Sequence, residues 1–134
     1  MLIAEGGCLC GAVRYRVSGT PVDAGFCHCR LCQRSSGGPV LLWMTLSRDA
    51  FQYVKGEPSA YKSSAGGERE FCGNCGTQLT FSSQDSVGTL DITVCSLDHP
   101  ETVTPEYHIW TVSQLPCVCL SDGLPTYRDA GPDV

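Results

Sequence analysis

Residues 71–77 read Phe-Cys-Gly-Asn-Cys-Gly-Thr (FCGNCGT), so that Cys72 and Cys75 are separated by two residues and each precedes a glycine. A CxxC pair that binds one metal ion needs a tight turn, and glycine favours such turns because it can adopt positive φ. A second pair, Cys8 and Cys10, lies near the start of the chain within GGCLCG. If that backbone is extended, both sulfurs point to the same face, because side chains alternate along a strand.

One CxC pair and one CxxC pair together supply the four thiolates of a closed structural zinc site. We expect Cys8, Cys10, Cys72 and Cys75 to form this site, because their pairing leaves the third cysteine cluster of the chain intact. The metal would join the N-terminal segment to the middle of the chain. Structural zinc contributes about 10–16 kcal/mol of apparent free energy, whereas a whole domain is typically stable by only about 5–15 kcal/mol. The fold is therefore expected to depend on this metal.

The third cluster consists of Cys27, Cys29 and Cys32, within residues 26–32 (FCHCRLC). Three protein ligands are the usual number in catalytic zinc sites, which leave the fourth position for water or substrate. Three thiolates make zinc a soft acceptor that suits a sulfur ligand. A free thiol with a pKa of about 8.5 is only about 3% ionised at neutral pH, so metal binding would increase its reactive fraction. We therefore expect a second zinc site that accepts a substrate thiol.

Three other side chains in this region are candidates for further roles. Arg30 and Arg34 could clamp a substrate carboxylate through bidentate hydrogen bonds, and the alternative is that both are solvated surface charges. His28 lies between two of the cysteines. In extended backbone its side chain would point away from theirs, so we expect that it does not bind the metal.

The composition limits the classes of function. We expect one domain over residues 1–134, with a polar tail from about residue 128. No segment approaches the roughly 20 apolar residues needed to span a membrane. The net charge of −5 argues against a nucleic-acid partner. The ten cysteines could form disulfides, but no export signal is visible at the start, so we expect a cytoplasmic protein with reduced, metal-binding thiols.

Alternating apolar and polar residues predict β-strands. In residues 12–17, for example, Val13, Tyr15 and Val17 fall on one face and the arginines on the other. Glycine and proline separate the predicted strands, as expected for turns. Helical periodicity is confined to a short turn at residues 31–36, so the sequence predicts an all-β fold. The predicted strands are residues 12–17, 40–46, 51–55, 78–82, 89–94 and 107–112.

Six segments, in order, resemble the glutathione-dependent formaldehyde-activating enzyme (GFA) family, which includes centromere protein V. They span residues 6–127 and read GGCLCGAVRY, CHCRLCQRSSG, GEPSAYKSS, REFCGNCGTQL, LDHPETVTPEYHIW and SDGLPTY. The resemblance implies a small zinc-stapled fold of two or more packed antiparallel sheets, with a structural zinc on the four-cysteine set and an active-site zinc on the three-cysteine set. It also implies a carbon–sulfur lyase or synthase, resembling S-hydroxymethylglutathione synthase. The implied substrates are glutathione or another thiol, and formaldehyde or another small aldehyde.

The sequence also departs from the family, which often has a tryptophan after Leu-Pro where this chain has Cys117 and Cys119. We expect this pair and Cys95 to pack as small apolar residues. Two alternative functions stay open, as does the oligomeric state. One is a zinc-stabilised protein-binding module without catalysis. The other is a methionine sulfoxide reductase with one of these three cysteines as nucleophile. The binding module would need a protein side chain to close the second zinc site, and the candidates are His28, His99, His108 and Cys95.

Overall fold

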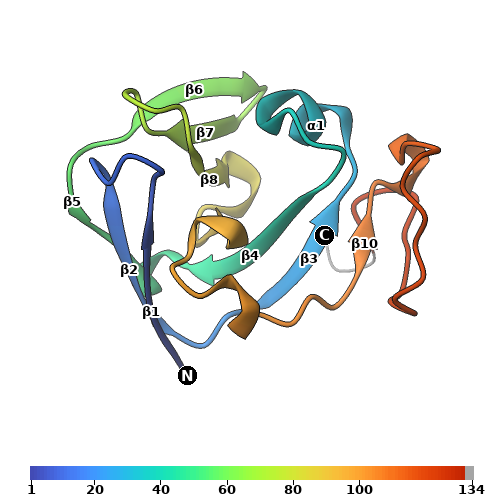
Figure 1. Cartoon of the computed structure of the whole chain (residues 1–134), viewed down its shortest axis with the longest axis horizontal. Coiled ribbons are helices and arrows are strands. Elements are labelled where there is room, and N and C mark those ends of the chain that lie inside the picture. The colour runs from blue at the N-terminus through green and yellow to red at the C-terminus, as the bar shows by residue number, and fades with distance from the viewer. Residues whose placement is uncertain (132–134) are drawn as a thin grey trace.

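Two packed β-sheets make up most of the fold (Figure 1), which confirms the predicted all-β class. A computed structural model describes residues 1–131 of the chain. In that part the strands are β1 (Leu2–Gly7), β2 (Arg14–Gly19), β3 (Asp23–Cys27), β4 (Leu41–Ser47), β5 (Phe51–Lys55), β6 (Ser59–Ser64), β7 (Gly67–Phe71), β8 (Gln78–Ser83), β9 (Thr89–Thr93) and β10 (His108–Ile109). The helices are α1 (Arg30–Ser36) and the 3-10 turns η1 (Arg48–Ala50), η2 (Gln84–Ser86), η3 (Val94–Ser96), η4 (Pro100–Thr102) and η5 (Thr111–Ser113).

The smaller sheet has the strand order β1-β2-β5, with both strand pairs antiparallel. The predicted alternation in β2 is confirmed, because Tyr15 and Val17 are fully buried while Arg16 is exposed and pairs with Glu5. The buried face of β2 packs into the main hydrophobic core, together with side chains from β4, β8 and β9 of the other sheet. Each sheet therefore contributes one face to a shared core.

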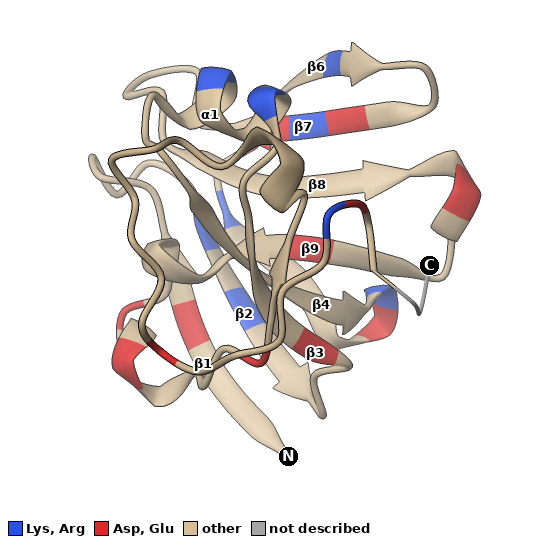
Figure 2. Cartoon of the chain, turned by 90° about the vertical axis from the view of Figure 1, so that its right-hand side faces the viewer, with Lys and Arg blue, Asp and Glu red and all other residues tan. Residues whose placement is uncertain are grey.

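The larger sheet has the order β10-β3-β4-β9-β8-β7-β6. All of its pairs are antiparallel except β10 with β3, which run parallel. In Figure 1, helix α1 follows β3 at one end of the sheet, near β6 and β7. In Figure 2, Lys and Arg positions are coloured blue on α1, β6 and β7, with acidic positions beside the blue one on β7, so this end carries basic residues although the chain as a whole is acidic.

Polar contacts of the smaller sheet with the loop after η3 and with the larger sheet supplement the core. The Arg14 guanidinium makes two hydrogen bonds to Asp98, at 2.6 and 2.9 Å. Tyr53 on β5 donates to Glu70 Oε1 on β7 at 2.8 Å. Burial and the neighbouring carboxylate raise the pKa of Tyr53 above its usual range, so the phenol stays protonated as the donor.

Five of the six predicted strands are confirmed with small shifts in their ends, and so is the short helix. The sixth, at residues 107–112, is shortened to the two residues of β10, and strands β1, β3, β6 and β7 were not predicted. The carbonyl oxygens of Arg128 and Asp129 accept hydrogen bonds from Val112 and Trp110, so this part of the predicted tail is attached to the segment after β10. Residues 132–134 lie outside the described part. No helix among the described residues is both long and apolar enough to cross a membrane.

Candidate metal centres and the adjoining pocket

The four predicted structural ligands come together in one group. The Sγ atoms of Cys8, Cys10, Cys72 and Cys75 all lie within 4.8 Å of one another. The Sγ–Sγ distance is 3.6 Å between Cys8 and Cys10 and 3.8 Å between Cys10 and Cys72. Four sulfurs arranged tetrahedrally at about 2.3 Å from one ion lie roughly 3.8 Å apart. The spacing and the all-thiol donor set therefore fit zinc.

Two turns position these sulfurs. At the CxxC turn, the Gly76 amide donates to the Cys72 carbonyl oxygen at 2.8 Å, and Gly76 has the positive φ of 84° that the glycine suggested. The expectation of extended backbone at Cys8 and Cys10 is wrong. These residues lie in a turn between β1 and β2, closed by a hydrogen bond from the Gly11 amide to the Cys8 carbonyl oxygen. The geometry of this turn, and not the alternation of side chains along a strand, brings the two sulfurs to one side.

The four-cysteine group links the two sheets. Cys8 and Cys10 follow β1 of the smaller sheet, whereas Cys72 and Cys75 lie between β7 and β8 of the larger one. The Asn74 side-chain amide also donates to Cys10 Sγ, at 3.3 Å. A metal ion held by this group would therefore cross-link the sheets next to the shared core.

The second group consists of Cys27, Cys29 and Cys32. Cys27 ends β3, Cys29 is the N-cap residue of α1, and Cys32 lies in the helix. The Sγ atoms of Cys27 and Cys32 are 3.4 Å apart, and the Cys32 amide donates to Cys29 Sγ at 3.3 Å. Within residues 1–131, no other cysteine, histidine or carboxylate joins this group. A strand end and a helix start thus bring three soft ligands together, and a metal ion held by them would keep a fourth position for a ligand from outside.

The three thiols differ in acidity. Hydrogen bonds with Cys27 and then Cys32 lower the pKa of Cys29, and the amide of Cys32 contributes to the shift. The pKa of Cys27 is raised, chiefly by its hydrogen bond with Cys29. The group therefore holds its first thiolate at Cys29, the charged form that a metal ion requires.

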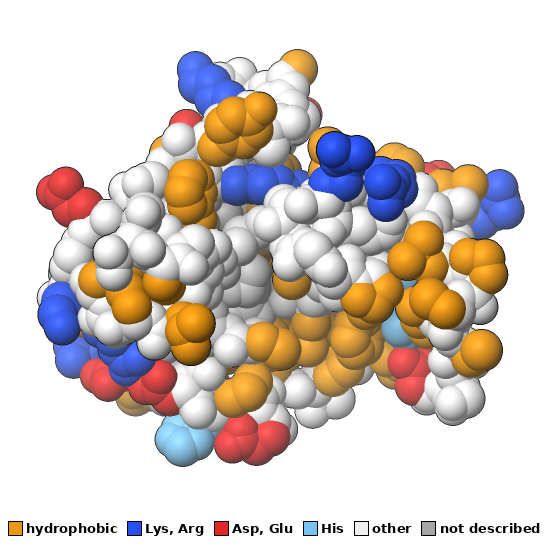
Figure 3. Space-filling model, turned by 45° about the horizontal axis from the view of Figure 1, so that its top comes forward, with side chains coloured by type: hydrophobic (Ala, Val, Ile, Leu, Met, Phe, Trp, Pro, Cys, Tyr) orange, Lys and Arg blue, Asp and Glu red, His pale blue; other side chains and the backbone are white. Residues whose placement is uncertain are grey.

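A pocket of about 460 Å³ adjoins the three-cysteine group. All three cysteines line it, and its other walls are largely apolar. Figure 3 shows that this side of the molecule is hollowed and that hydrophobic, Lys and Arg side chains gather there. Of the two predicted clamps, Arg30 lines the pocket and donates to Gln33 Oε1 at 2.8 Å, whereas Arg34 is exposed and outside the lining. By contrast, none of the four cysteines of the first group lines this pocket.

The sequence profile of the glutathione-dependent formaldehyde-activating enzyme family matches residues 3–113. The chain belongs to this family. A Halomonas elongata protein named "Putative glutathione-dependent formaldehyde-activating enzyme" is 36% identical over 87 residues, which cover 58% of this chain and 55% of that protein. An uncharacterized lyase of Schizosaccharomyces pombe is 31% identical over 77 residues, with coverages of 58% and 56%. The matches thus span about half the length of these two curated relatives.

Among solved structures, a crystal structure of a Rhodobacter sphaeroides protein aligns with a TM-score of 0.59. Its sequence identity is 20%, and the alignment covers 92% of this chain and 98% of that protein. This likeness shows a common fold. All seven clustered cysteines fall within the part that matches the GFA family, whereas Cys117 and Cys119 lie beyond it.

The candidate fourth ligands of the second zinc site do not join the three-cysteine group in this GFA-family fold. His28 points away from the cysteines, as expected, and its fully buried ring hydrogen-bonds His108 at 2.9 Å. His108 in turn contacts Asp122 Oδ2 at 2.7 Å and stacks on Phe26. His99 is exposed and pairs with Glu101. This series of side-chain contacts, from His28 through His108 to Asp122, therefore anchors the backbone between Cys27 and Cys29.

The expectation that Cys95, Cys117 and Cys119 pack as small apolar residues is wrong, because all three are exposed. Cys95 lies in the 3-10 turn η3, whose geometry interrupts strand alternation and turns this side chain outward while Val94 is buried. Cys117 and Cys119 lie in a loop, without the strand partners that burial would need. None of the three lines the pocket beside the three-cysteine group.

Trp110, Arg69 and Asp91 are among the pocket residues that the sequence analysis missed. Trp110 lines the pocket and has a φ of 57°, in the left-handed region that residues other than glycine rarely adopt. Arg69 and Asp91 lie on the same row of the larger sheet, because both are direct register partners of Phe81. A signal for Arg69 existed in the alternation Glu68-Arg69-Glu70, which places the arginine on the opposite face from both carboxylates.

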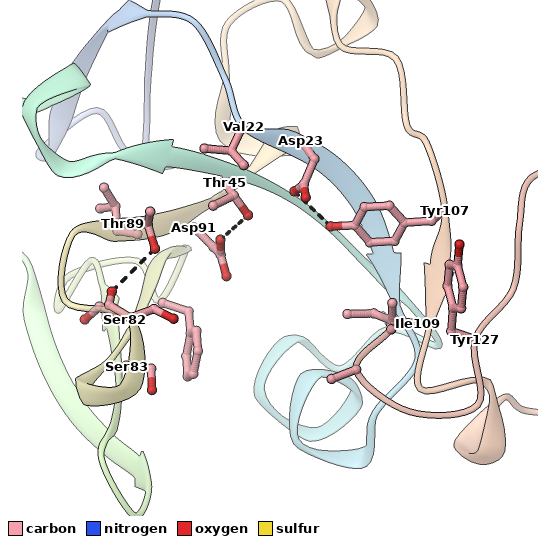
Figure 4. A pocket seen from close by; sticks show the side chains of 15 residues that line it. Val22, Asp23, Thr45, Ser82, Ser83, Thr89, Asp91, Tyr107, Ile109 and Tyr127 are labelled. Atoms are coloured by element: carbon pink, nitrogen blue, oxygen red, sulfur yellow. Dashed lines mark hydrogen bonds between the residues drawn. The ribbon is translucent and has the colours of Figure 1, made fainter. Parts of the chain in front are cut away.

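A second pocket, of about 510 Å³, continues along this face of the sheet and shares Thr45, Phe81, Asp91, Tyr107 and Ile109 with the first. Figure 4 shows the Thr45 hydroxyl donating to Asp91 and the Tyr107 hydroxyl donating to Asp23. Burial raises the pKa of Asp91 to about 6, with a smaller contribution from Asp23, although the Thr45 hydrogen bond opposes the shift. The shared groove therefore contains a carboxyl group that can take up or release a proton near neutral pH.

Proposed function

We propose that this chain is a zinc-dependent carbon–sulfur lyase or synthase. It would join the thiol of glutathione, or of another small thiol, to formaldehyde or another small aldehyde, and reverse that reaction. The observation that carries the proposal is that the three-cysteine group lines a pocket, whereas the four-cysteine group does not line it. Membership of the GFA family and the names of the two curated relatives agree with this reaction class.

The proposal gives the two metal sites different roles. Cys8, Cys10, Cys72 and Cys75 would hold a structural zinc ion, and the three-cysteine group would hold the second one, giving two per chain. Zinc bound by three thiolates supplies Lewis acidity to a sulfur ligand. In the reaction, the thiol sulfur bonds to the aldehyde carbon, and the proton that the sulfur loses ends on the aldehyde oxygen. Atoms and electrons balance without an oxidant or reductant.

The chain's own residues would supply binding and shielding. The apolar walls of the pocket, which include Trp43 and Phe81, exclude water from a small aldehyde. Arg30, on the pocket lining, remains a candidate clamp for a substrate carboxylate, and so does Arg34 if a substrate extends beyond the pocket. The proposed partners are therefore small molecules.

The test is adduct formation by the purified, zinc-loaded protein. Exchange between free and glutathione-bound ¹³C-formaldehyde is followed by NMR, with the uncatalysed exchange measured in the same buffer. We expect acceleration by the wild type, its loss in Cys29→Ser and its retention in Cys95→Ser, whose thiol is exposed and outside the pocket. If no thiol and aldehyde pair is accelerated although the protein binds two zinc ions, the protein-binding alternative replaces the enzyme. Loss of activity in Cys95→Ser would instead favour a thiol nucleophile.

A further inference from the structure

One charged side chain of the pocket is buried without a carboxylate partner. Arg69 on β7 is only 6% exposed and lines the pocket beside the three-cysteine group. Its Nη1 atom is buried and has no hydrogen-bond partner among the described residues. A buried guanidinium is costly unless its charge and its donors are satisfied, so an unpaired nitrogen on a side chain that lines a pocket indicates a missing ligand.

The rest of the Arg69 side chain is held firmly. Its Nε donates to Ser63 Oγ at 3.1 Å, and its Nη2 lies 3.9 Å from Cys32 Sγ. The guanidinium lies over the ring of Phe81, at 4.9 Å from the centroid, and at 5.8 Å from that of Trp43. These contacts fix the plane of the guanidinium group and leave Nη1 as the donor without a partner.

The neighbouring carboxylates cannot supply the missing acceptor. Glu68 and Glu70 flank Arg69 in sequence, but strand alternation places them on the opposite face. Glu70 Oε1 is already occupied there, because it accepts hydrogen bonds from Tyr53 and Thr80. No ion pair of Arg69 occurs among the described residues.

We propose that Arg69 Nη1 binds an anionic oxygen of the substrate while the substrate sulfur lies at the three-cysteine group. This assignment rests on the proposed thiol chemistry. Two oxygens share the required property, namely a carboxylate of the thiol compound and the oxygen that becomes negative when sulfur adds to the aldehyde carbon. Both would accept a charge-assisted hydrogen bond from a rigid donor in a water-poor site. The bond to Cys32 Sγ ties the donor to the metal ligands.

The experiment compares two thiols of equal length, 3-mercaptopropionate and the neutral 3-mercaptopropionamide. Their binding to zinc-loaded protein is measured by the fluorescence of Trp43 and Trp110, which line the pocket. The variants are Arg69→Met, Arg69→Lys and the control Arg16→Met, which alters an exposed arginine on the other sheet. Zinc content and thermal melting establish that each variant is folded and loaded.

If the anionic oxygen belongs to a carboxylate of the thiol compound, the wild type and Arg16→Met should bind 3-mercaptopropionate more tightly than the amide by at least about 10-fold. Arg69→Met should lose the preference without weaker binding of the amide, and Arg69→Lys should restore part of it. If the anionic oxygen is instead the one that the aldehyde contributes, the wild type and all variants should bind both thiols equally. In that case Arg69→Met should lower kcat for adduct exchange by about 10²-fold or more, with KM unchanged.

Unchanged selectivity together with unchanged kcat in Arg69→Met would overturn the inference and leave a purely structural arginine. The preference for the mercaptocarboxylate over the amide is measured independently of catalysis, so failure of this inference can be distinguished from failure of the proposed function. If the wild type catalyses no adduct exchange but its carboxylate preference depends on Arg69, the reaction is wrong and the anion site stands. If it catalyses no exchange and shows no preference, both are overturned.

Discussion

Replacing one cysteine in each metal group should destabilise the fold to very different extents. Cys72 is 1% exposed and belongs to the group that joins the two sheets, whereas Cys29 lies at the pocket and is only partly buried. Serine at position 29 also keeps the cap of α1, because its hydroxyl can accept from the Cys32 amide as the thiol does now. Cys29→Ser therefore removes a metal ligand with little change to the fold around it.

The size of the effect follows from the metal. If the four sulfurs share the roughly 10–16 kcal/mol of a structural zinc site equally, each accounts for about 2.5–4 kcal/mol. For a chain of this length, 1 kcal/mol shifts the melting temperature by about 4 °C. We expect Cys72→Ser to lower the melting temperature by about 10–16 °C or to prevent folding. Cys29→Ser should shift it by less than about 4 °C while the zinc content falls from two ions to one.

Circular dichroism melts and elemental analysis of the purified variants provide the assay, with Cys95→Ser as the control because that thiol belongs to neither group. Equal destabilisation by Cys29→Ser and Cys72→Ser would refute the division of roles between the two groups. So would a Cys72→Ser protein that melts like the wild type while it contains one zinc ion.

Three further predictions concern stability. Burial raises the pKa of Asp91, so its folded-state proton is retained up to about pH 6 while the unfolded chain loses it near pH 4; wild-type stability should fall across this window. Asp91→Asn should remove the fall and stabilise the protein by about 3 kcal/mol at pH 7.5 in urea unfolding, and a parallel pH profile would contradict the reasoning. His108→Phe keeps a ring at this position but leaves His28 Nε2 buried and unpaired and breaks the contact with Asp122, so urea melts should show a loss of about 2–4 kcal/mol, and a loss below 1 kcal/mol would be inconsistent with this network. Gly76→Ala meets no atom within 4 Å but must adopt a φ of 84°, so we expect a loss of about 1–2 kcal/mol in the same assay, and no loss would mean that the turn relaxes.

The sequence alone predicted the features that depend on near neighbours in the chain. The spacing of Cys72 and Cys75 with Gly76 predicted the tight turn, because turn geometry depends on a few consecutive residues. The alternation around Tyr15 predicted a half-buried strand for the same reason. The pairing of the CxC and CxxC segments was predicted from ligand counting, and their sulfurs do come together. Local reasoning was wrong where a turn replaced a strand, as at Cys8 and Cys95.

Only the tertiary structure decided which polar groups face the pocket. Arg69, Phe81 and Asp91 come from three strands, and their alignment depends on hydrogen-bond register between segments that no local pattern specifies. The burial of Arg69 is likewise set by the rings of Trp43 and Phe81 that fold over it. Ligand types are a property of the residues themselves and can be read from the chain. The surroundings of a charge, which set its energy and its use, exist only after distant segments have packed together.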